Sequence, residues 1–352
     1  MNQKFPLGLS YDDVLLVPQY SEINSRSDVD LGTQITPKVK LTLPIISINM
    51  TDVTGVEMAI ALGKAGGMGF LPRFVTPETQ ADMVSDVKKA GVLVGAAVGC
   101  KEGYIERAEM LVKAGADILT LDVAHGHMQK ALDATSTLKE KFGKDVDIIS
   151  GVIATYDGAY DLFKSGADSV RVGVGPGTIC ITRIKTGVGV PQISAVIEAS
   201  RAARKFNRTI LCDGGTKSHG DIFKGLAAGA SAVVIGSQLA GHDEAPGKII
   251  IQDGKKFKAY NASTSFTEKK MQAKILKDVG KDYVKHIEGV ESLVKYKGPV
   301  SVTLEEMESD IRAGLSYCGA RNIAELWKKA RFIRVTPMGF RENGSHDVIL
   351  AS

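Results

Sequence analysis

Short apolar runs recur along the chain at intervals of roughly 20–30 residues, and each is followed by a stretch with the spacing of a helix. Several runs lack the alternation of apolar and polar residues that a half-exposed strand shows. Parallel strands covered by helices are buried on both faces and show no such alternation. The pattern therefore predicts an α/β protein, a closed (β/α)8 barrel or TIM barrel. Its strands are expected at residues 43–48, 67–71, 92–98, 118–123, 147–152, 169–174, 209–212 and 232–236.

A repeated tetrapeptide supports this architecture. The sequences AGAD (114–117), SGAD (165–168) and AGAS (228–231) each stand directly before a predicted strand. A helix that ends at a glycine and is followed by a strand has the αβ turn expected in such a barrel.

Residues 242–300, after the eighth strand, depart from this rhythm because they are polar and rich in lysine. Long connections in compact domains are usually functional or mobile, so we expect a long, mobile flap there. Residues 302–331 return to helical periodicity. Since no linker or second core is visible, we expect residues 1–352 to form one barrel domain, with the flap at about 242–300 and a C-terminal segment at 332–352.

Composition narrows the class of protein. The chain has 352 residues, of which 44% are hydrophobic and 24% charged, and this excludes a disordered or collagen-like chain. Its net charge of +4 is spread along the sequence and predicts neither a nucleic-acid surface nor a membrane surface. No signal peptide is visible and no apolar run approaches the roughly 20 residues that span a bilayer, so we expect a cytoplasmic protein.

The four cysteines stand far apart and form no CxxC pair, which argues against a zinc ribbon or disulfides. Cys180 differs from Cys100, Cys212 and Cys318 because it lies in a glycine-rich loop after the sixth strand, at the end of the barrel where active sites lie. Both a catalytic nucleophile beside Thr182 and a small buried side chain fit its position.

Glycines follow the seventh and eighth strands, at Gly214, Gly215 and Gly236. Phosphate sites in these barrels often lie in those two loops, so the pattern favours a phosphorylated substrate, although plain turn glycines fit each loop alone. Asp213 then faces a sugar hydroxyl or, alternatively, caps a helix. His125 and His127 show no third ligand, and we expect no metal between them.

Five segments together resemble the IMP dehydrogenase and GMP reductase family, and the resemblance covers essentially the whole chain. The match is specific, and the five segments together are far more diagnostic than any lone glycine motif. The segments are YDDVLLVPQYS near the start, LDVAHGH (121–127), GVGPGTICITRIKTGVGVPQ (173–192), CDGGTKSHGD (212–221) and VVIGSQLAGHDEAPG (233–247).

The resemblance implies a barrel enzyme, usually a homotetramer, whose cysteine adds to purine C2 of a nucleoside monophosphate while nicotinamide exchanges a hydride at that carbon. Carried over by position, Cys180 is the nucleophile, and Thr182 and Glu288 form the proton-transfer pair. The substrate-binding residues it implies are Thr178, Asp213, Gly214, Gly215, Gly236, Ser237, Tyr260 and Ser263. Asp122, Val123 and Ala124 border the nicotinamide, Ser25 and Arg26 contact NADP, and the carbonyls of Gly175, Gly177 and Cys180 hold potassium.

The resemblance implies both reaction directions, and several features favour the reductase. Residues 71–99 leave no room for the paired CBS module that dehydrogenases usually carry. Dehydrogenases activate water with an Arg-Tyr pair on the flap, whereas this chain has no arginine between Tyr260 and Glu288. The nearest substitute is Lys281-Asp282-Tyr283, and an ammonium lacks the geometry of a guanidinium.

Further features divide between the two directions. Ser25, Arg26 and His242 look like the reductase, and an arginine there favours the 2′-phosphate of NADP. The segments EAPG (244–247), KGP (297–299) and FRENGSHDV (340–348) look like the dehydrogenase.

Two segments depart from the family pattern. Thr51-Asp52 reverses the usual order, and Ala262-Ser263-Thr264 replaces a glycine-methionine stretch beside the purine, so an altered base pocket is expected. The leading hypothesis is an NADPH-dependent GMP reductase that releases IMP and ammonia. The alternatives are an IMP dehydrogenase without the CBS module, which makes XMP with NAD; a catalytically silent barrel that binds purine nucleotides; and a flavin-dependent barrel.

Overall fold

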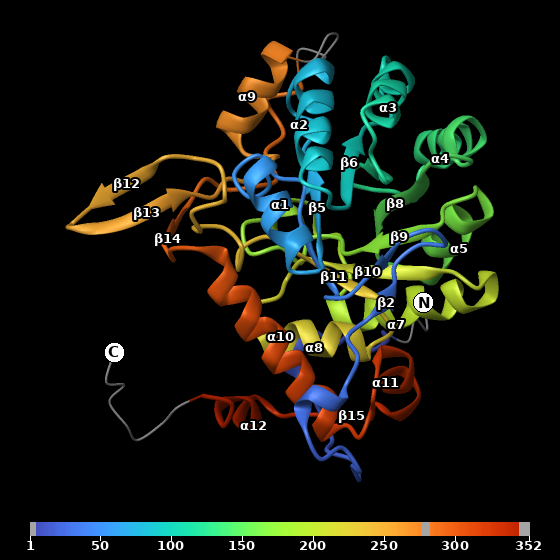
Figure 1. Ribbon diagram of the computed structural model, residues 1–352, viewed down its shortest axis with the longest axis vertical. Helices are drawn as coiled ribbons and strands as arrows, with labels where there is room; N and C mark the ends of the chain where they lie inside the picture. Colours follow the sequence, from blue (N-terminus) through green and yellow to red (C-terminus); the bar gives the residue numbers. More distant parts are fainter. Residues whose placement is uncertain (1–4, 276–281, 345–352) are drawn as a thin grey trace.

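The computed structural model describes residues 5–275 and 282–344, and its centre is a closed barrel of eight parallel strands (Figure 1). The strands follow one another around the barrel in chain order, and the last pairs with the first. All eight predicted strands are confirmed, each end within two residues of its prediction. They are β4 (Ile45–Ser47), β5 (Met68–Leu71), β6 (Val94–Val98), β7 (Ile118–Asp122), β8 (Asp147–Ile153), β9 (Ser169–Val172), β10 (Thr209–Asp213) and β11 (Ala232–Ile235).

Helices surround the barrel, and the residues at their ends explain where they begin (Figure 1). Thr76 accepts the Thr79 N–H to start α2, and Ser218 with Asp221 forms a capping box at the start of α8. The helices between the barrel strands are α1 (Val56–Lys64), α2 (Pro77–Lys89), α3 (Tyr104–Lys113), α4 (Gln129–Phe142), α5 (Tyr156–Lys164), α6 (Thr182–Thr186), α7 (Gln192–Phe206) and α8 (His219–Ala227).

The barrel interior is filled by apolar side chains, as in other barrels of this type. Phe70, Met68 and Ile149 belong to one buried cluster, together with Ile35 and Leu41 from the N-terminal hairpin. That hairpin, β2 (Thr33–Gln34) and β3 (Lys40–Leu41), closes the amino end of the barrel, since the Ile35 carbonyl accepts the Thr209 hydroxyl at the start of β10. The opposite, carboxyl end is left for the site.

The segment after β11 contains a three-stranded antiparallel sheet and a helix that the sequence pattern did not resolve. The strands are β12 (Ile249–Gln252), β13 (Lys255–Ala259) and β14 (Leu293–Lys295), and the helix is α9 (Phe266–Ile275). Figure 1 shows the β12–β13 hairpin projecting away from the barrel. Residues 276–281 lie outside the described part of the chain.

The predicted helical periodicity of residues 302–331 is confirmed by α10 (Val300–Tyr317) and α11 (Ile323–Lys329). The chain then returns to its beginning, because β15 (Phe332–Arg334) pairs antiparallel with β1 (Val14–Leu16). The last described helix is α12 (Pro337–Arg341), and residues 345–352 lie outside the description. Within residues 5–275 and 282–344, no helix is long and apolar enough to cross a membrane.

Candidate active site

A cavity of about 380 Å³ opens at the carboxyl end of the barrel, and its size falls within the range of small-molecule sites. Loops from six of the eight strands and the flap contribute to it, so residues far apart in the sequence meet there. Most of the predicted site residues line this cavity: Asp122, Val123, Ala124, Gly175, Gly177, Thr178, Cys180, Thr182, Asp213, Gly214, Gly215, Gly236, Ser237, Tyr260, Ser263 and Glu288.

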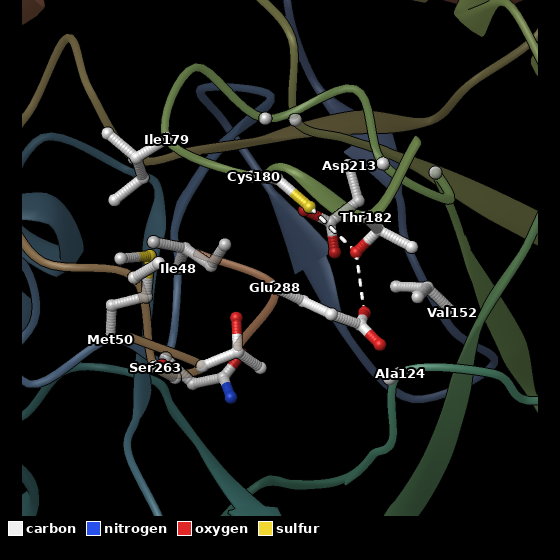
Figure 2. A pocket seen from close by; sticks show the side chains of 18 of the residues that line it. Ile48, Met50, Ala124, Val152, Ile179, Cys180, Thr182, Asp213, Ser263 and Glu288 are labelled. Atoms are coloured by element: carbon white, nitrogen blue, oxygen red, sulfur yellow. Dashed lines mark hydrogen bonds between the residues drawn. The ribbon is translucent and has the colours of Figure 1, made fainter. Parts of the chain in front are cut away.

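Cys180, Thr182 and Glu288 form a hydrogen-bonded chain in the cavity (Figure 2). The Cys180 Sγ lies 3.2 Å from the Thr182 Oγ1, and that hydroxyl donates to the Glu288 Oε2 at 2.7 Å. Cys180 is only partly buried, which rules out the alternative of an enclosed structural thiol. The arrangement provides a nucleophile beside a proton-transfer pair.

Glu288 is held in its ionised form. The hydrogen bond from Thr182 is the largest cause that lowers the pKa of this carboxyl, and His286 lowers it further. The His286 Nε2 lies 2.6 Å from the Glu288 Oε1, so both carboxylate oxygens have a partner. Backbone bonds secure the pair, since the Ile181 N–H donates to the Glu288 carbonyl.

The loops after β10 and β11 have the backbone that an anion site requires. Gly214 and Gly215 have φ values of 84° and 83°, a conformation that favours glycine. A Cβ at Gly236 would stand 2.8 Å from the Tyr260 hydroxyl, so only glycine leaves this approach open. Thr178 donates to Ser237 at 3.4 Å and joins the cysteine loop to the loop after β11.

A buried arginine links two of the predicted carboxylates. Arg171 on β9 donates from Nε to the Asp213 Oδ2 at 2.7 Å, and its Nη1 lies 3.6 Å from the Asp122 Oδ1. Arg73 donates to the other oxygen of Asp122 at 2.9 Å. Burial alone would raise the pKa of Asp122, but the two guanidinium groups lower it below its ordinary value. Burial raises the pKa of Asp213 despite Arg171.

Sequence reasoning missed Arg171 and Arg73, although both line the cavity. A signal for Arg171 was present: it is the one charged residue in the apolar run of 169–174. A cation in a strand buried on both faces requires a buried anion. Asp213 ends β10, which adjoins β9, and Asp122 ends β7, two strands from β9 on its other side. No comparable signal marks Arg73, which lies in a loop.

The flap covers the cavity with polar side chains from α9 and the segment after it. Gln272 donates to the Ser263 carbonyl at 2.7 Å and accepts the Tyr283 hydroxyl at 2.5 Å. Lys269 and Tyr283 also line the cavity. Of the predicted Lys281-Asp282-Tyr283 substitute, Lys281 lies outside the described residues.

The two departures from the family pattern occupy different places. Ala262, Ser263 and Thr264 line the cavity, whereas Thr51 and Asp52 are not among the lining residues. Thr51 donates to Glu268 at 3.1 Å, and Asp52 accepts the Asn261 N–H at 2.9 Å. The Thr51-Asp52 pair therefore attaches the flap to the loop after β4 rather than shaping the pocket directly.

Ser25 and Arg26 are not brought to the cavity within one chain. They lie at the 3-10 helix η2 (Arg26–Asp28), which packs against α10 outside the barrel. A cofactor contact from these residues therefore requires a second copy of the chain.

The predicted potassium ligands lie in the cysteine loop. The Gly177 carbonyl accepts the Cys180 N–H at 3.1 Å, which leaves one of its two lone pairs available. Arg183 donates to the Val174 carbonyl beside Gly175. Potassium binding by the carbonyls of Gly175, Gly177 and Cys180 stays a prediction. Over the described ranges, no three His, Cys, Asp or Glu side chains gather closely enough to hold a metal ion.

Fold and cavity place the chain among the (β/α)8-barrel proteins that carry their functional groups at the carboxyl ends of the strands. A family model of the IMP dehydrogenase / GMP reductase domain matches residues 8–346. The chain therefore belongs to the IMP dehydrogenase / GMP reductase family of oxidoreductases, and the predicted resemblance is confirmed.

Relatives from both branches are similar over nearly the whole chain. An inosine-5'-monophosphate dehydrogenase of Nitrosopumilus maritimus is 34% identical and covers 99% of this chain and 100% of its own. A GMP reductase of Leishmania donovani is 33% identical, with 97% of each chain covered. A crystal structure of Trypanosoma brucei GMP reductase C318A in complex with guanosine 5'-monophosphate superposes with a TM-score of 0.92 at 30% identity, covering 98% of this chain and 99% of that one.

The lengths of the relatives test the argument from the CBS module. The alignments with the dehydrogenase and the reductase are 477 and 481 positions long, although this chain has 352 residues. Both relatives therefore carry long stretches without a counterpart here. Because one of them is a reductase, the absence of extra residues does not separate the two activities, contrary to the prediction from the CBS module.

Proposed function

We propose that the chain is a GMP reductase, which converts GMP to IMP and ammonia with NADPH. The hydrogen-bonded chain of Cys180, Thr182 and Glu288 fits both reaction directions, and the observation that carries the reductase proposal is the state of the cavity arginines. Arg73 and Arg171 are both bound to carboxylates, so neither is free to activate water as a dehydrogenase requires. The structural similarity to a GMP-bound reductase supports the same direction.

Separate groups of residues bind the phosphate, bind the ribose and carry out the reaction at C2. The N–H groups of Gly215 and Gly236 bind the phosphate, whereas that of Gly214 donates to the Val234 carbonyl. Asp213 accepts a ribose hydroxyl. The Cys180 thiolate adds to C2 of the base, and Thr182 with Glu288 delivers the proton with which the C2 amine leaves as ammonia. This substitution exchanges a C–N bond for a C–S bond, so atoms and charge balance.

The carboxylate of Asp122 beside the apolar Val123 and Ala124 suits a nicotinamide riboside, which needs a hydroxyl acceptor next to a flat apolar surface. Reduced nicotinamide supplies the hydride that side chains lack. We further propose that K+ binds the carbonyls of Gly175, Gly177 and Cys180 and orders the cysteine loop.

An IMP dehydrogenase is the second candidate, favoured by the Nitrosopumilus relative and by Tyr283, which lines the cavity. In that reaction Tyr283 would help to activate water. The Tyr283 hydroxyl instead donates to Gln272, so it is not directed at a water molecule. The dehydrogenase is for this reason the second candidate.

Absorbance of the reduced nicotinamide, followed in two assays in potassium buffer, distinguishes the reductase from the dehydrogenase. GMP with NADPH is expected to lose absorbance of the reduced nicotinamide and to release one ammonia per NADPH. IMP with NAD is expected to show no rise. A rise only with IMP and NAD would establish the dehydrogenase, and nucleotide binding without turnover would establish a silent barrel.

A further inference from the structure

We propose that His286 is a relay residue that carries protons between bulk water and the Glu288–Thr182 pair. The inference rests on the proposed function and deepens it by assigning the route by which protons reach the cavity. Release of the C2 amine as ammonia takes up one proton in every turnover. A site that is closed by a flap needs a path along which that proton is replaced.

The described residues form such a path without a gap. The Cys180 Sγ, the Thr182 Oγ1 and the Glu288 carboxylate are joined at 3.2 and 2.7 Å, and the His286 Nε2 continues the chain at 2.6 Å. Exposure rises sharply along it: the Glu288 side chain is 18% exposed and that of His286 is 62% exposed. One end of the chain thus faces the reacting sulfur and the other faces water.

The chemistry of each group suits its place. Glu288 is the inner acceptor, and an imidazole exchanges protons with water near neutral pH and presents a nitrogen on each side of its ring. The ring takes a proton from water on Nδ1 and passes the proton of Nε2 to Glu288. It is then neutral again, but as the opposite tautomer. Proton exchange with water restores the first tautomer.

The surroundings hold His286 in place and set its electrostatic environment. Lys269 on α9 donates from Nζ to the His286 carbonyl, which fixes the backbone under the ring. The charged groups that face His286 are Glu288, the Lys269 ammonium and the neighbouring ion pair of Lys285 with Asp282. Among the described residues, Glu288 is the one whose side chain contacts a ring nitrogen of His286.

His286→Gln tests the relay, because glutamine keeps a hydrogen-bond donor but cannot exchange a proton. We expect kcat for GMP and NADPH to fall by about tenfold or more, KM for GMP to stay within about twofold, and free imidazole to restore the rate, since general acid–base groups contribute roughly 10²–10⁴-fold. The matched control is His219→Gln: that imidazole also contacts a carboxylate, Asp310, at 2.7 Å, but outside the cavity.

Unchanged kcat across pH in His286→Gln, or a loss that imidazole does not restore, would overturn the relay while leaving the reductase intact. Failure of the wild-type protein to turn over either nucleotide would instead refute the proposed function. The relay is then judged by NMR of the His286 ring, whose Nε2 signal must change in Glu288→Gln because its hydrogen-bond partner is replaced. An unchanged Nε2 signal contradicts the link between the two residues.

Discussion

Arg171 holds two carboxylates of the cavity at once, and its removal leaves Asp213 without a cation among the described residues. Both partners of the Arg171–Asp213 pair are almost fully buried. Breaking a buried pair by removing one partner costs about 3–5 kcal/mol. We therefore expect Arg171→Met to lower the free energy of unfolding by that amount, measured by urea denaturation.

The control is Arg201→Met on α7, where the exposed pair with Glu198 is worth about 0–1 kcal/mol. The double variant Arg171→Met/Asp213→Asn is expected to regain part of the lost stability because no buried charge is left unpaired. Equal losses for Arg171→Met and Arg201→Met would contradict this account of the network.

Glu288 makes stability depend on pH. Because its pKa in the folded protein lies below the ordinary 4.5, its stabilising contribution is fully present above pH 4.5 and is lost as the pH falls through the lowered value. We expect Glu288→Gln to melt at a lower temperature than the wild-type protein at pH 7, and the difference to shrink below pH 4.5. A difference that stays constant with pH, or that also appears in Glu305→Gln on the exposed face of α10, would contradict it.

At the scale of elements, the barrel could be predicted and the flap could not. Fully buried strands such as β6 appear in the sequence as apolar runs, and glycine marks the turn before several of them. The residues of β12 are all exposed, and β14 pairs with β13 from more than thirty residues further along the chain. The buried residues of α9 are Glu268 and Gln272, so no apolar stripe reveals that helix.

Lys258 on β13 secures the base of the hairpin. Its buried ammonium donates to the carbonyls of His242, Asp243 and Ala245. Lys258→Met leaves these acceptors without their donor, and we expect a loss of about 1–3 kcal/mol, with faster hydrogen exchange of the amides in residues 241–247. The control is Lys255→Met, because Lys255 is exposed on the same strand. It should change neither the stability nor the hydrogen exchange. A similar change in both variants would argue against an anchoring role for Lys258.

At the scale of the whole molecule, Ser25 and Arg26 lie outside the cavity of their own chain. If Arg26 binds the NADPH 2′-phosphate, a neighbouring copy in the expected homotetramer must supply it. Co-expression of Cys180→Ala with Arg26→Ala chains tests this, since hybrid oligomers combine an intact Arg26 with an intact Cys180. We expect such hybrids to recover the low KM for NADPH. A monomeric protein, or activity that is only the average of the two variants, would contradict it.

The site residues were predictable to the extent that they lie in loops at strand ends, where glycine and cysteine stand out. Arg73, Gln272 and Lys269 reach the cavity through tertiary packing of segments that carry no distinctive pattern. His286 stands two residues before Glu288, so their contact is local, whereas the contact of Glu288 with Thr182 joins residues 106 positions apart.

Covalent attack by Cys180 on C2 of GMP is the central claim, and intact-protein mass spectrometry tests it most directly. The protein is mixed with GMP and NADPH, quenched in acid during turnover and compared with Cys180→Ala and with Cys318→Ala, whose cysteine is buried at the end of α10. The account predicts a mass increase equal to GMP less ammonia, located on the peptide of Cys180, in the wild-type and Cys318→Ala proteins, and no turnover by Cys180→Ala. Full turnover by Cys180→Ala would contradict it.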